Sequence, residues 1–290
     1  MQASLLTAIL LPLALAVVML GMGLSLVPDD FRRIAREPQA VALGAVCQLL
    51  LLPLIGTAIA LLLPLEPAIA VGLVVIALCP GGPSSNFVTY LAGGDVALSV
   101  TLTALNSLIT VFTIPILTNF ALRYFLGETS AIALPLGETI LQIFVITVIP
   151  IALGMASRQR FPQTACQLEK QMSRLAIALL ALIILLLLIR EGNQLPRFIA
   201  QVGIGVLLLN SLAMLAGLAV AKLGRLPRRQ QTCLTIEVGI QNGTLAIAVT
   251  AGLLDNPDMA IPAAVYSLLM YLTALIAIGY GRRADRSPMT

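Results

Sequence analysis

The feature that most constrains the fold of this chain is a series of long apolar stretches with few or no charged residues. Only 10% of the 290 residues are charged and 59% are hydrophobic, whereas soluble chains carry roughly a quarter charged residues. A helix that spans a bilayer needs about 20 consecutive apolar residues, and many stretches here reach that length. The sequence therefore predicts an all-α membrane protein whose residues 1–290 form a single membrane domain.

Charged residues divide the apolar sequence into nine predicted transmembrane helices, with boundaries good to a few residues. A separate soluble domain does not fit in the remaining length. The predicted spans are about 4–27, 39–63, 68–91, 96–120, 135–156, 174–190, 199–221, 231–254 and 260–281.

The distribution of lysine and arginine predicts the orientation, because basic residues favour cytoplasmic loops. Nine spans with a cytoplasmic C-terminus and an outside N-terminus place the basic residues near 32–36, 158–174, 222–229 and 282–286 on the inside. This topology accounts for the net charge of +4, so no nucleic-acid partner is expected. We expect a multi-pass protein of the cell (inner) membrane with the lipid bilayer around it and no obligate protein partner.

Several enzyme classes are excluded by residue types that the chain lacks. It contains no histidine, which removes His-based metal sites and Ser-His-Asp triads. Its four cysteines form no CxxC pair, and no phosphate loop or dinucleotide fingerprint is present. The chain is therefore not expected to be an enzyme or to drive transport with ATP by itself.

The third and eighth predicted spans contain residues that a passive lipid-facing helix should not carry. In the third, Cys79–Asn86 (CPGGPSSN) has two prolines and two glycines, which remove backbone donors and helical preference. In the eighth, Thr235–Thr244 contains glycines and Glu237, the only carboxylate well inside an apolar stretch. A charge at that depth costs about 2.5 to 3.5 kcal/mol on insertion scales, which makes an intramembrane carboxylate a functional candidate.

These two interrupted spans are an odd number of crossings apart, so they run through the membrane in opposite directions. Paired interrupted helices of inverted orientation are typical of secondary transporters built from inverted repeats, with the site at the repeat interface. Hydroxyl, amide and carbonyl oxygens with one carboxylate suit a hard cation. A single acid favours a monovalent ion, and the lack of histidine favours Na⁺ over a proton chain. The uncharged candidates are Ser84, Ser85, Asn86, Ser99, Thr103, Gln48, Gln241 and Asn242.

The segments Cys79–Asn86, Tyr90–Ser99 (YLAGGDVALS) and Thr235–Gly243 (TIEVGIQNG) resemble the bile acid:sodium symporter family, as does Gly21–Leu26. The resemblance covers nearly the whole chain and implies a core domain, a smaller panel domain and two broken crossing helices. It matches the nine-helix bacterial form. The implied panel helices are 4–27, 135–156 and 174–190, and the implied core helices are 39–63, 68–91, 96–120, 199–221, 231–254 and 260–281.

The same resemblance implies two sodium sites and a substrate side. The first sodium site would use Ser85, Asn86, Ser99, Thr103 and Glu237. The second would use Gln48, Glu237, Val238, Ile240 and Gln241, with the aliphatic residues contributing backbone carbonyls. Residues expected at the substrate are Pro83, Ser84, Asn242, Gly243 and Tyr271, where this chain departs in part from the family pattern.

Together these observations predict a sodium-coupled symporter of a small or amphipathic organic anion that works by alternating access. Na⁺ is the only small cofactor expected. Two alternatives stay open at this point: a proton-coupled organic anion carrier that titrates Glu237, and a channel.

Overall fold

The computed structural model describes residues 11–127, 134–190 and 195–285. Within these ranges every regular element is a helix, apart from one isolated β-bridge. The predicted all-α class is confirmed.

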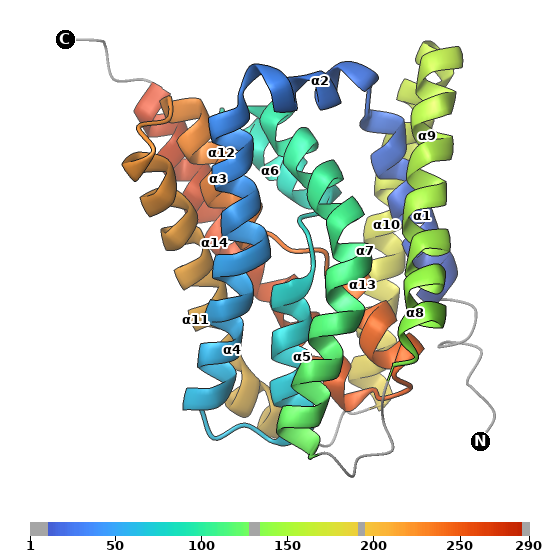
Figure 1. Ribbon diagram of the computed structural model, residues 1–290, viewed down its shortest axis with the longest axis vertical. Coiled ribbons are helices and arrows are strands. Elements are labelled where there is room, and N and C mark those ends of the chain that lie inside the picture. The colour runs from blue at the N-terminus through green and yellow to red at the C-terminus, as the bar shows by residue number, and fades with distance from the viewer. Residues whose placement is uncertain (1–10, 128–133, 191–194, 286–290) are drawn as a thin grey trace.

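One group of helices contains both the N-terminal helix α1 and the middle of the chain, and lies to the right in Figure 1. Helix α1 packs against α9 and α10, and α8 and α9 are joined through the π-helical segment η3. Close approach is possible because Gly23 and Gly154 meet at the contact, where a Cβ on Gly23 would lie 2.2 Å from the Ile151 carbonyl oxygen. The bounds are α1 Leu11–Ser25, α8 Leu136–Ile143, η3 Phe144–Val148, α9 Ile149–Arg160 and α10 Pro162–Arg190.

The second group surrounds a helix that is buried along most of its length. Helix α5 is buried at every residue from Ile69 to Leu78 and packs against α4, α7 and α14. Helices α11, α12 and α14 pack beside one another on the left of Figure 1. The bounds are α3 Pro38–Val46, η2 Cys47–Leu51, α4 Leu52–Leu62, α5 Pro67–Leu78, α6 Pro83–Leu91, α7 Val96–Leu126, α11 Leu195–Leu223, α12 Arg228–Gly239, α13 Gly243–Ile247, η4 Ala248–Leu253, η5 Asp258–Ala260 and α14 Ile261–Asp285.

Several of these helices are long and apolar enough to cross a bilayer. Among the described residues there are five such helices by length and composition, or six if the bent pair α1 and α2 is one span. The chain is therefore a multi-pass membrane protein. The number is lower than the nine spans that we predict, partly because the interrupted spans appear as short pieces such as Pro67–Leu78 and Gly243–Leu253. Residues 4–10 of the first predicted span lie outside the described part of the chain.

Two segments that were expected to be loops are helical. Residues Pro28–Arg36 form α2, which is bent by 69° from α1 and crosses the top of Figure 1. Its first turn carries two aspartates and its last turn two arginines, an order that complements the helix dipole. Similarly, α9 ends at Arg160 and α10 begins at Pro162, so the expected loop before residue 174 is short.

Turns from distant parts of the sequence meet at one end of the molecule. The Gln39 side chain donates to the Gly224 carbonyl (2.8 Å), and the Asp95 backbone N–H donates to the Arg229 carbonyl (3.0 Å). Arg33 of α2 forms an ion pair with Asp95 (2.7 Å). Residues 28–39, 92–95 and 222–230 therefore contribute to one face, which we call the basic face because it contains two of the predicted cytoplasmic basic segments.

Replacing Asp95 by asparagine is expected to destabilise the protein by about 1 kcal/mol, because the ion pair with Arg33 is mostly buried while a carboxamide still caps α7. The side chains of this pair are only 23% and 17% exposed. Thermal unfolding in detergent measures the change. Asp29→Asn is the control, since its two arginine partners are 74% and 66% exposed and such surface pairs contribute little. Equal melting temperatures for the two variants would contradict the stabilising role of the ion pair between Arg33 and Asp95.

Candidate ion and substrate site

The interruptions predicted in two spans are present, and they contact each other. Helix α5 ends at Leu78 and α6 begins at Pro83, while α12 ends at Gly239 and α13 begins at Gly243. Prolines at 80 and 83 lack the N–H that a continuous helix needs. The two gaps pair through a single antiparallel bridge between Gly81 and Gln241, and the Asn242 N–H donates to the Pro80 carbonyl (2.9 Å). Backbone polar groups released at each break are thus partly satisfied by the other break.

Glu237 lies on α12 immediately before its break and is 1% exposed. The Ser99 hydroxyl donates to one carboxylate oxygen of Glu237 (2.6 Å), and the Thr103 hydroxyl donates to the other. The two hydroxyls share one face of α7 because they are four residues apart. The carboxylate is therefore bonded to uncharged hydroxyl groups inside the protein and does not face lipid.

More oxygen atoms surround Glu237 than there are hydroxyl protons to form hydrogen bonds between them. Oδ1 of Asn86 lies 2.8 Å from the Ser99 hydroxyl and 3.3 Å from the Thr103 hydroxyl, yet each hydroxyl has a single proton and already contacts Glu237. Ser85 is fully buried beside the same carboxylate, and its hydroxyl donates to the Gly82 carbonyl (2.8 Å). All five residues predicted for the first sodium site are brought together, and their oxygens converge as cation ligands do.

The residues predicted for the second site meet on the other side of the breaks. Gln48 lies in the π-helical segment η2 and donates from Nε2 to the Cys79 carbonyl (2.7 Å) and to Oε1 of Gln241 (2.7 Å). The Gln241 amide in turn donates to the Val238 carbonyl (2.7 Å). Oε1 of Gln48 is buried without a partner among the described residues, so one ligand-type oxygen is available here. Ile240 is also fully buried and its backbone is extended.

The residues that are predicted to contact the substrate lie in two places. Ser84 and Tyr271 are partly exposed, and their hydroxyl oxygens are 3.1 Å apart, beside Pro83 at the start of α6. Asn242 caps α13 by accepting from the Leu245 N–H (3.0 Å), while its Nδ2 is buried without a partner in the described chain. Gly243 faces α14 closely, where a Cβ would lie 1.8 Å from the Ser267 hydroxyl. Gly243 thus has a packing role in this structure.

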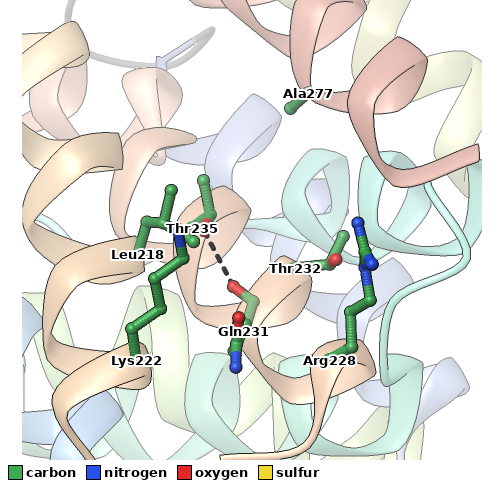
Figure 2. A pocket seen from close by; sticks show the side chains of 7 residues that line it. All are labelled: Leu218, Lys222, Arg228, Gln231, Thr232, Thr235 and Ala277. Atoms are coloured by element: carbon green, nitrogen blue, oxygen red, sulfur yellow. Dashed lines mark hydrogen bonds between the residues drawn. The ribbon is translucent and has the colours of Figure 1, made fainter. Parts of the chain in front are cut away.

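A separate pocket of about 310 Å³ lies between α11, α12 and α14. Figure 2 shows Lys222 and Arg228 on its two sides, with the Thr235 hydroxyl bonded to the Gln231 carbonyl between them. It contains none of the predicted site residues and is lined by Leu218, Lys222, Arg228, Gln231, Thr232, Thr235 and Ala277.

Sequence reasoning missed some backbone contributions. The Cys79 carbonyl accepts from Gln48, the Pro80 carbonyl accepts from Asn242 of the other break, and the Gly81 backbone lies close to Glu237. The π-helical turn that carries Gln48 was also missed. A signal for it exists, since η2 and η3 each end two residues before a proline (Pro53 and Pro150) whose missing N–H cannot continue an α-helical ladder.

Neutral oxygens around one buried carboxylate, placed where two interrupted helices meet inside a multi-pass membrane protein, define the class of secondary transporters. Comparison with known proteins agrees. Residues 12–197 match the family described as the sodium bile acid symporter family. The chain belongs to this family, whose members are transporters and not enzymes.

Relatives of known description are about equally distant from this chain. It is 30% identical to the uncharacterized sodium-dependent transporter YocS of Bacillus subtilis, over 92% of this chain and 81% of that protein. It is 30% identical to the probable chloroplastic sodium/metabolite cotransporter BASS2 of rice, over 91% of this chain and 61% of that protein. It is also 30% identical to human sodium/bile acid cotransporter 4, over 81% of this chain and 54% of that protein.

Proposed function

We propose that this protein is a sodium-coupled symporter of an organic anion. The observation that carries the proposal is the buried Glu237 carboxylate, which contacts Ser99 and Thr103. In the described part of the chain, no basic side chain forms an ion pair with it. A buried carboxylate needs a compensating charge, and a small cation among these oxygens supplies it. The names of the relatives, which are sodium-dependent transporters and cotransporters, support the same cation.

Sodium is the ion that the donor set fits best. Its first site takes oxygens from Ser85, Asn86, Ser99, Thr103 and Glu237, of which only one is charged. Among the described residues there is no cluster of three or more His, Cys, Asp or Glu side chains, as a divalent or transition metal would favour. The second site takes Gln48, Glu237, Gln241 and the carbonyls of Val238 and Ile240, with the unpaired Gln48 oxygen as its clearest ligand.

The charges of a two-sodium cycle balance in the buried site. Two Na⁺ ions, the Glu237 carboxylate and one monovalent anion sum to zero, so the loaded carrier crosses the membrane without a buried net charge. Each cycle would then transfer one net charge from the sodium ions and the substrate, which is worth about 2.3 kcal/mol per 100 mV.

The substrate anion would bind at the start of the two helices that follow the breaks. Pro83 and Ser84 start α6, and Asn242 has an unpaired buried amide nitrogen at the start of α13. Helix N-termini and a free amide donor suit a carboxylate or sulfonate group. Sodium binding would order the two breaks first, and the anion would then dock against these donors and Tyr271.

The transport cycle that we propose requires two parts that move relative to each other. The panel domain consists of α1, α8 to α10, and the core domain contains the remaining helices around the breaks, with α2 connecting the two. The proposed topology keeps nine transmembrane helices in an inverted repeat. The basic face, residues 28–39, 92–95 and 222–230, would lie on the cytoplasmic side of the cell (inner) membrane, as the positive-inside rule expects.

A thermal-shift experiment tests the proposal without knowledge of the substrate. Sodium is expected to raise the melting temperature of the purified protein above its value in the same concentration of potassium. At a tenfold excess of sodium over Kd, binding should increase the free energy of unfolding by about 1.4 kcal/mol. Small carboxylates and sulfonates are then screened with and without sodium. A hit that needs sodium supports the symporter. Stabilisation that follows pH and ignores sodium would indicate the proton-coupled carrier instead.

Replacing Gln48 by methionine is expected to remove one of two sodium sites. Methionine has a similar length but lacks the amide nitrogen that donates to Cys79 and Gln241 and the amide oxygen proposed as the sodium ligand. The sodium dependence of thermal stabilisation should then fall from a Hill coefficient above one to about one. Gln39→Met, which removes an exposed glutamine from the neighbouring α3, serves as the control. An unchanged coefficient in the Gln48 variant contradicts the second site.

A further inference from the structure

One buried face of α7 continues to carry polar side chains beyond the Glu237 site. Ser99 and Thr103 lie at Glu237, and Ser107 and Thr110 follow on the same face at helical spacings of four and three residues. Thr118 lies two turns further along this face, and all five side chains are at most 4% exposed. Adjacent Asn106 extends the row, which we call the α7 polar row: Asn106, Ser107, Thr110 and Thr118.

The α7 polar row is short of hydrogen-bond partners. Both side-chain polar atoms of Asn106 and the hydroxyls of Ser107 and Thr118 are buried without a partner among the described residues. Helix α7 packs against α5, whose residues Pro67–Leu78 are all apolar and offer no side-chain partner. Buried polar groups are almost always bonded to protein, water or an ion. Several orphaned groups in one row therefore indicate a surface that is in contact with water or an ion during function.

The oxygens of the α7 polar row suit a cation that binds weakly and moves along the helix. Asn106, Ser107, Thr110 and Thr118 supply amide and hydroxyl oxygens, and none of them is charged. Pro115, inside α7, also has no N–H to bond the Val111 carbonyl, which leaves a further oxygen on this helix. Weak, repeated neutral ligands allow an ion to enter and leave, whereas a carboxylate retains it.

The position of the row gives it a direction. Helix α7 begins at Val96, directly after its cap residue Asp95 on the basic face, and runs away from that face (Figure 1). From Thr103 at Glu237 to Thr118 at the far end of the row, α7 rises about 22 Å at 1.5 Å per residue, which is most of the thickness of a hydrocarbon core. It thus connects Glu237 with the membrane side opposite the basic face.

We infer that the α7 polar row is the route along which sodium reaches Glu237 from the side of the membrane opposite the basic face. This inference rests on the proposed function. It assigns Asn106, Ser107, Thr110 and Thr118 to ion access, in addition to the residues that bind the ion. A route differs from a binding site in one measurable respect: blocking it slows the arrival and departure of the ion equally and leaves the equilibrium affinity unchanged.

The test measures binding of ²²Na⁺ to the purified full-length protein, with association rate, dissociation rate and Kd taken from the same samples. Asn106→Leu has a similar volume and removes two unpaired polar atoms, so it should fold at least as stably as the parent protein. Both rates are expected to fall about tenfold, as a barrier increase of about 1.4 kcal/mol gives, with Kd unchanged. Ser107→Val is the second variant and should slow both rates in the same sense.

Thr101→Val is the matched control, because Thr101 is a buried threonine on the opposite face of α7 whose hydroxyl bonds to Asp30 and Ala97. Its rates should equal those of the parent protein. Unchanged rates in both row variants would overturn the route, and so would a weaker Kd with an unchanged association rate, which would make the row a binding site. Failure of the parent protein itself to bind ²²Na⁺ saturably would count against the proposed function and not against the route alone.

Discussion

Replacing Glu237 by glutamine is expected to abolish sodium-dependent stabilisation of the protein and sodium-dependent uptake. Glutamine has the same shape and can still bond Ser99 and Thr103, so the variant changes charge and little else. Removing the charged partner from a buried ion site costs about 3 kcal/mol, or more than a hundredfold in sodium affinity. The measurement is the melting temperature as a function of sodium concentration, at constant ionic strength.

The melting temperature without sodium provides a second readout of this prediction. A buried carboxylate that lacks its cation is costly, so the glutamine variant should be at least as stable as the parent protein in sodium-free buffer. The variant would thus be stable and insensitive to sodium at the same time, which separates loss of binding from loss of folding. Cys166→Ala changes a residue of α10 outside the site and should keep the full sodium response. A Glu237 variant that keeps the parental sodium dependence would remove the basis of the proposed mechanism.

The sequence predicted the position of both helix breaks because their cause is local. Proline and glycine at 80–83 and glycine at 239 and 243 act on the backbone within a few residues, and Glu237 is conspicuous in an apolar stretch. The grouping of Ser99 and Thr103 with Glu237 depended on the family resemblance, since nothing in the spacing of residues on α7 reveals which face meets α12. The structure brings these residues together, and sodium occupancy stays a prediction.

Features that depend on the relation between distant segments could not be predicted in this way. Helix α2 lies in a predicted loop because five of its nine residues are charged, although their order favours a helix and Arg33 pairs with Asp95. The unpaired atoms of Asn106 cannot be predicted from the sequence, because only the folded structure determines which side chains lie within reach of them. The contact of Gly81 with Glu237 likewise follows from how the two breaks meet.

The close approach of Gly81 to Glu237 leads to the second prediction with a large expected effect, a loss of sodium affinity. A Cβ on Gly81 would lie 2.4 Å from Oε1 of Glu237, closer than real Cβ atoms approach, and 3.1 Å from the Ser85 hydroxyl, which is a tight contact. Gly81→Ala must therefore displace the carboxylate or the break itself. Ion ligands need to be held within a few tenths of an ångström. Sodium affinity is therefore expected to fall by at least about tenfold, the equivalent of 1.4 kcal/mol.

Gly82→Ala is the matched control for Gly81→Ala, because it adds the same methyl group to the neighbouring residue of the same break. A Cβ on Gly82 would lie 3.6 Å from Asn242, an ordinary contact, and the Gly82 backbone is extended at φ −141°, which alanine adopts freely. Both variants lose the same chain flexibility, so a difference between their sodium titrations reports the contact with Glu237 alone. If the two alanine variants bind sodium equally well, the carboxylate does not have to stay where the structure places it, and the geometry of the first sodium site would need to be rebuilt around a different set of oxygens.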